Sequence, residues 1–346
     1  MTDPGDHAAT GHDSSHDPLE DAADLDVLVH RADLDGLVRL LDARGAAHDW
    51  AGVLEARDRA RAALSSGRQL WPVATLAEYR LALWAPPEWA ARVLDDESGR
   101  FTIGPLTEVA AQRHTFADLA PHVHEPHRLG LLAHERALRG EAIPPSTPDP
   151  FEIPFDRQPW EPTYALATYS DDGIDDPPPA TPVTYDAAAV PLPHDAEVLD
   201  DDLVESAVRQ LFDTWTAASN GRVDVCCVEG SAAHAVGALG VPSARLVTLP
   251  AADALAWLSW AGATGAAQGR RRGAASGRFA AWWLLAALGD LVDDWPPHPD
   301  ELGEVAQRLR WWWWDAGEPS LGWAVHLAVE DPDEGIAWAV SAHDAR

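Results

Sequence analysis

Apolar residues at helical spacing predict a series of short helices over residues 19–140. Leu34, Leu37 and Leu41 recur every three or four positions and form one apolar stripe. Further helices are expected over residues 50–60, 76–84, 88–94 and 128–139, where prolines and glycines mark the ends. Consecutive short helices joined by short turns are typical of a helical array, although no strict period identifies a repeat family.

The pattern changes over residues 141–200. Between Pro145 and Glu205 the chain has twelve prolines, fifteen carboxylates and a single arginine. Such a composition opposes a packed core and favours an extended linker. From residue 201 onward, apolar runs of strand length alternate with helical patterns, which indicates a second folded part.

Five segments define this second part. Residues 223–228 and 244–249 predict buried strands separated by a helix that begins near Ser231, an arrangement that favours a parallel pair with a right-handed crossover. Residues 302–314 predict an amphipathic helix that ends in Trp311–Trp314. Successive helical residues are about 100° apart, so these rings cannot all face one core. We expect at least one to reach a second surface, in domain packing or a homo-oligomer contact. Residues 323–329 and 336–342 alternate like the strands of a hairpin.

The patterns together predict an α + α/β fold class. The expected parts are a disordered acidic tail (1–18), an α-helical domain (19–140), a Pro/Asp-rich linker (141–200) and a Trp-rich α/β domain with a small sheet (201–346).

Charge narrows the function classes. The formal net charge is −31, every basic residue is arginine, and both nucleic acid and anionic membranes are expected to be repelled. The sequence has no apolar run of membrane-spanning length and no secretory signal at its start, and its two cysteines are adjacent, so we expect a cytoplasmic protein. The acidity has two alternative explanations, a high-GC coding bias and the acidic surface of a halophilic protein.

One stretch stands apart from this acidity. Between Gly230 and Gly289 the only carboxylate is Asp253. The same stretch carries a Gly/Arg-rich segment, 262–278, whose candidate anion-binding residues are Gly269, Arg270, Arg271, Arg272, Gly273 and Arg278. A helix that starts near Ser276 or Arg278 would add its N-terminal dipole. The alternatives are that the arginines pair with the protein's own carboxylates, and that the glycines allow close helix packing.

Two weaker constellations remain. Glu229 and His234 follow a predicted strand end, where ligands bind in open α/β sheets, and are candidates for acid–base chemistry or for a capped helix. His122, His124 and His127 lie near Pro121 and Pro126 and are weak candidate metal ligands, because they lack the spacing of a helical zinc motif. The favoured alternative is a polar helix N-terminus. No cofactor is implied by any motif.

The segments Gly269–Gly273, Gly277–Trp283, Leu309–Gly317 and Leu327–Pro332 resemble bacterial families of unknown function from high-GC genomes. The resemblance implies no activity. Because no complete catalytic constellation is present, we expect a non-enzymatic binding or adaptor protein with a protein partner. The alternative is an enzyme or sensor that binds a phosphate- or carboxylate-bearing small molecule at 262–278.

Overall fold

The computed structural model describes residues 18–95, 102–317 and 322–345. Nearly all of the predicted acidic tail, residues 1–17, lies outside the described residues. The chain forms two compact units, Met1–Ala77 and Glu78–Arg346. The four-part division expected from composition stays a prediction.

The first unit is helical. Its elements are α1 (Pro18–Arg31), α2 (Leu34–Ala46), α3 (Trp50–Leu64) and the first half of α4 (Trp71–Trp84). Asp33 and Asp49 cap α2 and α3, because each carboxylate accepts a backbone N–H at 2.9 Å three residues later. The predicted stripe is confirmed at Leu37 and Leu41, which are fully buried, but not at Leu34, which is exposed at the start of α2.

Helices also open the second unit. They are α5 (Pro87–Leu94), α6 (Leu106–Ala111), α7 (Phe116–Leu119) and α8 (Pro126–Leu138). Pro87 and Pro126 occupy first-turn positions, where the absent N–H leaves no hydrogen bond unmade. The helical character expected for this part of the sequence is confirmed.

A seven-stranded antiparallel sheet forms the centre of the second unit. Its order is β3-β6-β7-β8-β9-β5-β4. The strands are β3 (Val190–Pro191), β4 (Val198–Leu199), β5 (Arg222–Glu229), β6 (Ser243–Leu249), β7 (Arg310–Asp315), β8 (Gly322–Asp331) and β9 (Ile336–Ala345). The predicted parallel pair is wrong: β7, β8 and β9 separate β5 from β6. The predicted hairpin is confirmed as β8 and β9.

The four consecutive tryptophans belong to β7 and not to a helix. The preceding helix, α14 (Pro299–Arg308), ends before them, so the predicted helical placement of Trp311–Trp314 is wrong. Side chains alternate between the faces of a strand. Trp311 and Trp313 therefore enter the larger core, whereas Trp312 and Trp314 enter the smaller one.

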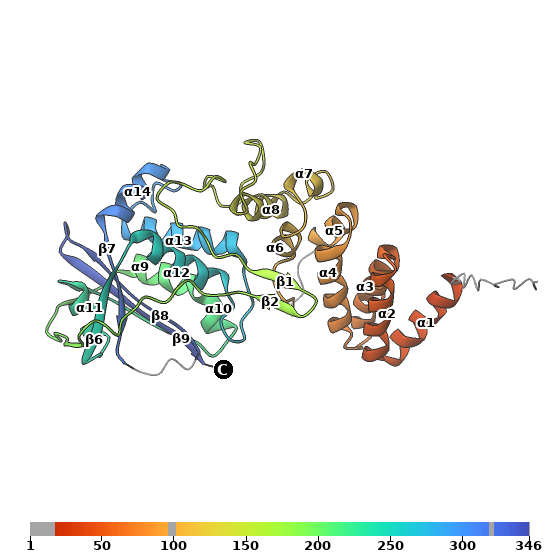
Figure 1. Cartoon of the computed structure of the whole chain (residues 1–346), viewed down its shortest axis with the longest axis horizontal. Helices are drawn as coiled ribbons and strands as arrows, with labels where there is room; N and C mark the ends of the chain where they lie inside the picture. Colours follow the sequence, from red (N-terminus) through yellow and green to blue (C-terminus); the bar gives the residue numbers. More distant parts are fainter. Residues whose placement is uncertain (1–17, 96–101, 318–321, 346) are drawn as a thin grey trace, which may run out of the picture. The chain divides into compact units, whose positions relative to one another are not determined.

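Helices cover the two faces of the sheet unequally (Figure 1). The larger core contains residues from α9 (Asp202–Leu211), α10 (Asp213–Ala217), α12 (Ala251–Ala263), α13 (Ala274–Leu288) and α14. A smaller core lies under α11 (Ala232–Ala238) on the other face. The mixed α+β fold class is confirmed, and the sheet of the second unit is antiparallel throughout.

Residues 141–200 run as an extended strap with little regular structure. The strap contains a short hairpin, β1 (Thr168–Ser170) and β2 (Gly173–Asp175), and then supplies both edge strands of the large sheet. β3 pairs with β6, and β4 pairs with β5. Proline-rich chain suits these edges, because an edge strand leaves half of its N–H groups unpaired.

Candidate functional site

The Gly/Arg-rich segment connects α12 to α13. Helix α13 begins at Ala274, slightly before the predicted start, and its cap residue Gly273 has a φ of 96°. This left-handed conformation favours glycine. The first-turn N–H groups of α13 find their acceptors within the protein. The Ala274 N–H donates to Glu108 at 3.1 Å, and the Ala275 N–H donates to Glu135 at 2.8 Å. The anion-binding end of the helix is therefore filled by two carboxylates of the chain itself.

Arg271 lies 5% exposed beside the same carboxylates. Its Nε and Nη2 reach the two oxygens of Glu108, each at 2.8 Å, and its Nη1 reaches Asp176 at 2.6 Å. Burial alone would raise the pKa of Glu108, but the adjacent Arg271 guanidinium keeps that pKa below its usual value. Tyr169 donates its hydroxyl proton to Glu108 at 2.5 Å. Arg271 is thus held in a buried, bidentate ion pair.

Glu135 is the second carboxylate of this cluster and is 2% exposed. Arg139 donates to it at 2.9 Å, in addition to the Ala275 N–H. Burial, and then the charge of neighbouring Glu108, raise the pKa of Glu135 to about 7. Burial also raises the pKa of Asp176. Perturbed carboxyl groups of this kind are frequent at functional sites and in structural ion networks alike.

Arg278 lies a turn further along α13 and is fully buried. It forms a second bidentate pair, with Glu161 at 2.9 and 3.1 Å, and donates to the carbonyl oxygens of Pro154, Phe155 and Asp156. Trp282 donates its indole N–H to the same carboxylate. Arg278 therefore anchors the strap to α13.

The remaining arginines stand closer to the surface. Arg270 is exposed, and half-buried Arg272 donates to the carbonyl oxygen of Gln210 at 3.1 Å. Gly269 lies in the turn before them, where an added Cβ would meet the carbonyl oxygens of Gly265 and Thr214. The structure thus brings Arg271 and Gly273 together at the start of α13, while Arg278 occupies a separate contact.

In the first of the two weaker constellations, His234 takes part in a helix cap. Ser231 and His234 form the capping box of α11, with 2.8 Å between Oγ and Nδ1, and Glu229 is an exposed residue at the end of β5. Since the sheet is antiparallel, the strand-end argument for Glu229 and His234 loses its basis.

His122, His124 and His127 are exposed on the loop before α8 and in its first turn. Glu125, beside them, accepts the N–H groups of His127 and Arg128 as the cap of α8. Among the residues that the structure describes, no group of three His, Cys, Asp or Glu side chains is placed to hold a metal.

The adjacent cysteines are free thiols. Burial raises the pKa of Cys226 to about 11 and that of Cys227 to about 12, so both stay protonated at neutral pH. A protonated thiol is a weak nucleophile and a weak metal ligand.

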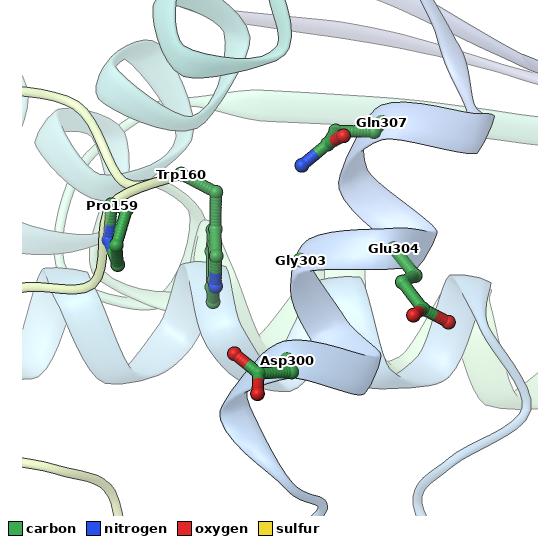
Figure 2. Close-up of a pocket in the computed structure, with 6 residues that line it drawn as sticks. All are labelled: Pro159, Trp160, Asp300, Gly303, Glu304 and Gln307. Atoms are coloured by element: carbon green, nitrogen blue, oxygen red, sulfur yellow. The ribbon is translucent and has the colours of Figure 1, made fainter.

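A groove that the sequence did not reveal lies between the strap and α14. It has a volume of about 340 Å³ and is lined by Pro159, Trp160, Asp300, Gly303, Glu304 and Gln307 (Figure 2). Trp160 donates its indole N–H to the carbonyl oxygen of Pro299 at 2.9 Å, and its ring lies 5.0 Å from the ring of Trp282. An added Cβ at Gly303 would lie 2.9 Å from the indole nitrogen. The sequence feature that indicates this groove is Trp160, a lone tryptophan between prolines in a polar stretch of the strap.

The chain belongs to a protein family described as "Family of unknown function (DUF6183)", whose model matches residues 35–346. This finding confirms the resemblance to an uncharacterised family. No curated protein matches the chain, and neither does any solved structure. Within the described ranges, every helix is too short or too polar to span a bilayer.

Proposed function

We propose that the protein is a non-enzymatic binding protein that holds a basic segment of a partner protein in the groove between the strap and α14. The observation that carries the proposal is the lining of this groove. It combines an indole ring, two exposed carboxylates (Asp300 and Glu304) and one amide, and none of its six lining residues is basic.

The charge and the aromatic ring of the groove favour a basic ligand. Arginine and lysine side chains are attracted to an indole face and to carboxylates, and the net charge of −31 attracts a cationic partner over longer distances. Figure 2 shows Trp160 beside α14, with Asp300 and Gln307 next to it. The indole N–H bond to Pro299 and the contact with Trp282 hold the ring before a partner arrives, which lowers the entropy cost of binding.

The state of the arginines also favours this function over a small-anion site. Arg271 and Arg278 are each engaged by a buried carboxylate. An incoming phosphate would have to replace Glu108 or Glu161, leaving that charge buried without a partner. An anion site on this segment would therefore depend on Arg270 and Arg272.

The test is calorimetric titration of the full chain with capped tetra-arginine, tetra-lysine and tetra-glutamate peptides and with inorganic phosphate. We expect tetra-arginine to bind, more tightly at low salt than at high salt. The double variant Asp300→Asn, Glu304→Gln should weaken binding about two- to thirty-fold, the effect of losing two exposed charge contacts. The control Asp293→Asn, Asp294→Asn removes two other exposed carboxylates and should change affinity less than about two-fold.

Equal losses in the two double variants would show diffuse attraction and overturn the groove assignment. Absence of peptide binding would do the same. Phosphate binding that disappears in Arg272→Ala would establish the small-anion function instead. Gly303→Ala gives an independent check, because the added methyl group displaces Trp160 and should weaken tetra-arginine binding without changing charge.

A further inference from the structure

Five charged side chains from four segments meet at the first turn of α13. They are Glu108 of α6, Glu135 of α8, Arg139 at the end of α8, Asp176 after β2, and Arg271 just before α13. The side chains of Glu108, Glu135 and Arg271 are at most 4% exposed, and those of Asp176 and Arg139 are 10% and 11% exposed. We call these five residues the α13 clasp.

The charges of the clasp do not balance. Three carboxylates face two guanidinium groups, which leaves one excess negative charge when every group is ionised. Tyr169 adds no charge to this sum, because burial raises its pKa well above the usual value and keeps the phenol neutral. A buried uncompensated charge is costly, and a carboxylate in this situation takes up a proton.

The contacts indicate which group takes the proton. Both oxygens of Glu108 are bound by Arg271, and they also accept from Ala274 and Tyr169. The carboxylate of Glu135 accepts hydrogen bonds from only one guanidinium nitrogen, Nη1 of Arg139, and from the N–H of Ala275. Asp176 is bound by a single guanidinium nitrogen, Nη1 of Arg271. Glu108 is therefore the best stabilised of the three anions. Of the other two, Glu135 is the more deeply buried, since its side chain is 2% exposed and that of Asp176 is 10% exposed.

We propose that the α13 clasp binds one proton in the folded protein at neutral pH, principally on Glu135, and that this proton strengthens the attachment of α13 to α6 and α8. The pKa of Glu135, raised to about 7 by burial and by the charge of Glu108, agrees with this assignment. The raised pKa of Asp176 makes it the second group to share the proton. The site is independent of the groove and of its partner.

The sign of the pH effect follows from linkage. Glu135 has a higher pKa in the fold than in the unfolded chain, so the folded state binds more protons between the two values. The stabilisation by this proton is fully present below the unfolded pKa and is lost as the pH rises through about 7. Buried histidines act in the opposite direction: burial lowers the pKa of His326 to about 4, so its contribution is lost as the pH falls.

The experiment is thermal unfolding of the full chain between pH 6 and 8.5. For the wild type we expect Tm to fall by a few degrees from pH 6 and to level off above about pH 7, where Glu135 is ionised in both the folded and the unfolded chain. Glu135→Gln reproduces the protonated side chain in shape and charge. Its Tm should change little over this range and should equal or exceed the wild-type value at pH 8.5.

Glu161→Gln is the matched control. Glu161 is also a buried glutamate, but Arg278 balances its charge one to one. This variant should have a lower Tm at every pH and the same pH slope as the wild type. The carboxyl ¹³C signal of Glu135 in the wild type, assigned by its absence from Glu135→Gln, should titrate near pH 7.

A wild-type Tm that stays constant or rises from pH 6 to 8.5 would overturn the proposal, as would an unchanged slope in Glu135→Gln. If Glu135→Gln does not fold, the wild-type ¹³C titration decides alone: no glutamate carboxyl group titrating above pH 6 contradicts proton binding by the clasp.

Discussion

Arg278 shows how one buried charge is tolerated in the interior of this protein. Its guanidinium group reaches both oxygens of Glu161 and three main-chain carbonyl groups, and all of these acceptors lie in residues 154–161 of the strap. A buried pair of this kind adds little net stability compared with apolar residues of similar size. Removing one partner is costly, however, because the other charge stays in the core.

Arg278→Ala should therefore lower the free energy of unfolding by about 3–5 kcal/mol. Arg278→Lys keeps the charge but not the planar fork, and should cost about 1–3 kcal/mol because several acceptors lose their donor. Urea unfolding monitored by tryptophan fluorescence measures both values. The control is Arg209→Lys, at an exposed arginine paired with Glu205, which should change stability by less than about 0.5 kcal/mol. A lysine at position 278 that costs as little as the control would contradict the role of the fork.

The site was only partly predictable at the residue scale. Five arginines and a single carboxylate between Gly230 and Gly289 distinguish this stretch from the rest of the chain. The partners of Arg271 and Arg278, however, lie 163 and 117 residues earlier in the chain. Sequence spacing does not reveal whether an arginine pairs with a distant carboxylate or with a ligand, because the answer depends on tertiary contacts. The groove was missed for the same reason.

At the element scale, the same stretch illustrates the packing role of small residues. Gly277 of α13 faces α12, and a Cβ at this position would lie 2.7 Å from the Cβ of Ala263 and would also meet the carbonyl oxygen of Ser259. The glycine thus permits close approach of two apolar helices, one of the alternatives that the sequence left open.

Gly277→Ala should destabilise the protein although alanine is the better helix former, because overpacking costs about 1–3 kcal/mol. Gly45 of α2 offers the comparison: it is also helical, but its Cβ would have no neighbour within 4 Å. Gly45→Ala should stabilise by up to about 1 kcal/mol. Opposite signs of the two changes in urea unfolding are the expected result, and stabilisation by Gly277→Ala would refute the close contact.

Element type was predictable where periodicity was unambiguous and was not where it was absent. The β8–β9 hairpin alternates clearly along both strands. Trp311–Trp314 has no periodicity of its own. The helical pattern of α14 stands directly before these residues, so a helix is predicted across residues that form β7. The parallel pair failed because strand–helix–strand succession does not exclude later strands from entering between β5 and β6.

For the whole molecule, the dominant property is the net charge of −31. Most carboxylates have no arginine available, since 25 basic residues face 56 acidic ones. Repulsion among exposed carboxylates favours unfolding and decreases when salt screens it. The Debye length falls from about 10 Å at 0.1 M to about 3 Å at 1 M, a range that covers neighbouring surface charges.

We therefore expect the protein to be folded in 0.05 M KCl and its Tm to rise by several degrees on going to 1 M KCl. Differential scanning calorimetry between pH 6 and 8.5 measures this shift at each pH, and tetramethylammonium chloride at equal ionic strength separates screening from specific potassium binding. Buried pairs are screened much less than exposed ones. The pH-dependent step of the α13 clasp should therefore persist in 1 M KCl, so that surface and interior electrostatics separate in one data set. If 1 M KCl removes the pH-dependent step as well as the surface repulsion, the pKa of Glu135 depends more on the net charge of the molecule than on its buried neighbours. A chain that is unfolded at 0.05 M KCl would identify the acidity as a halophilic adaptation and not as a coding bias.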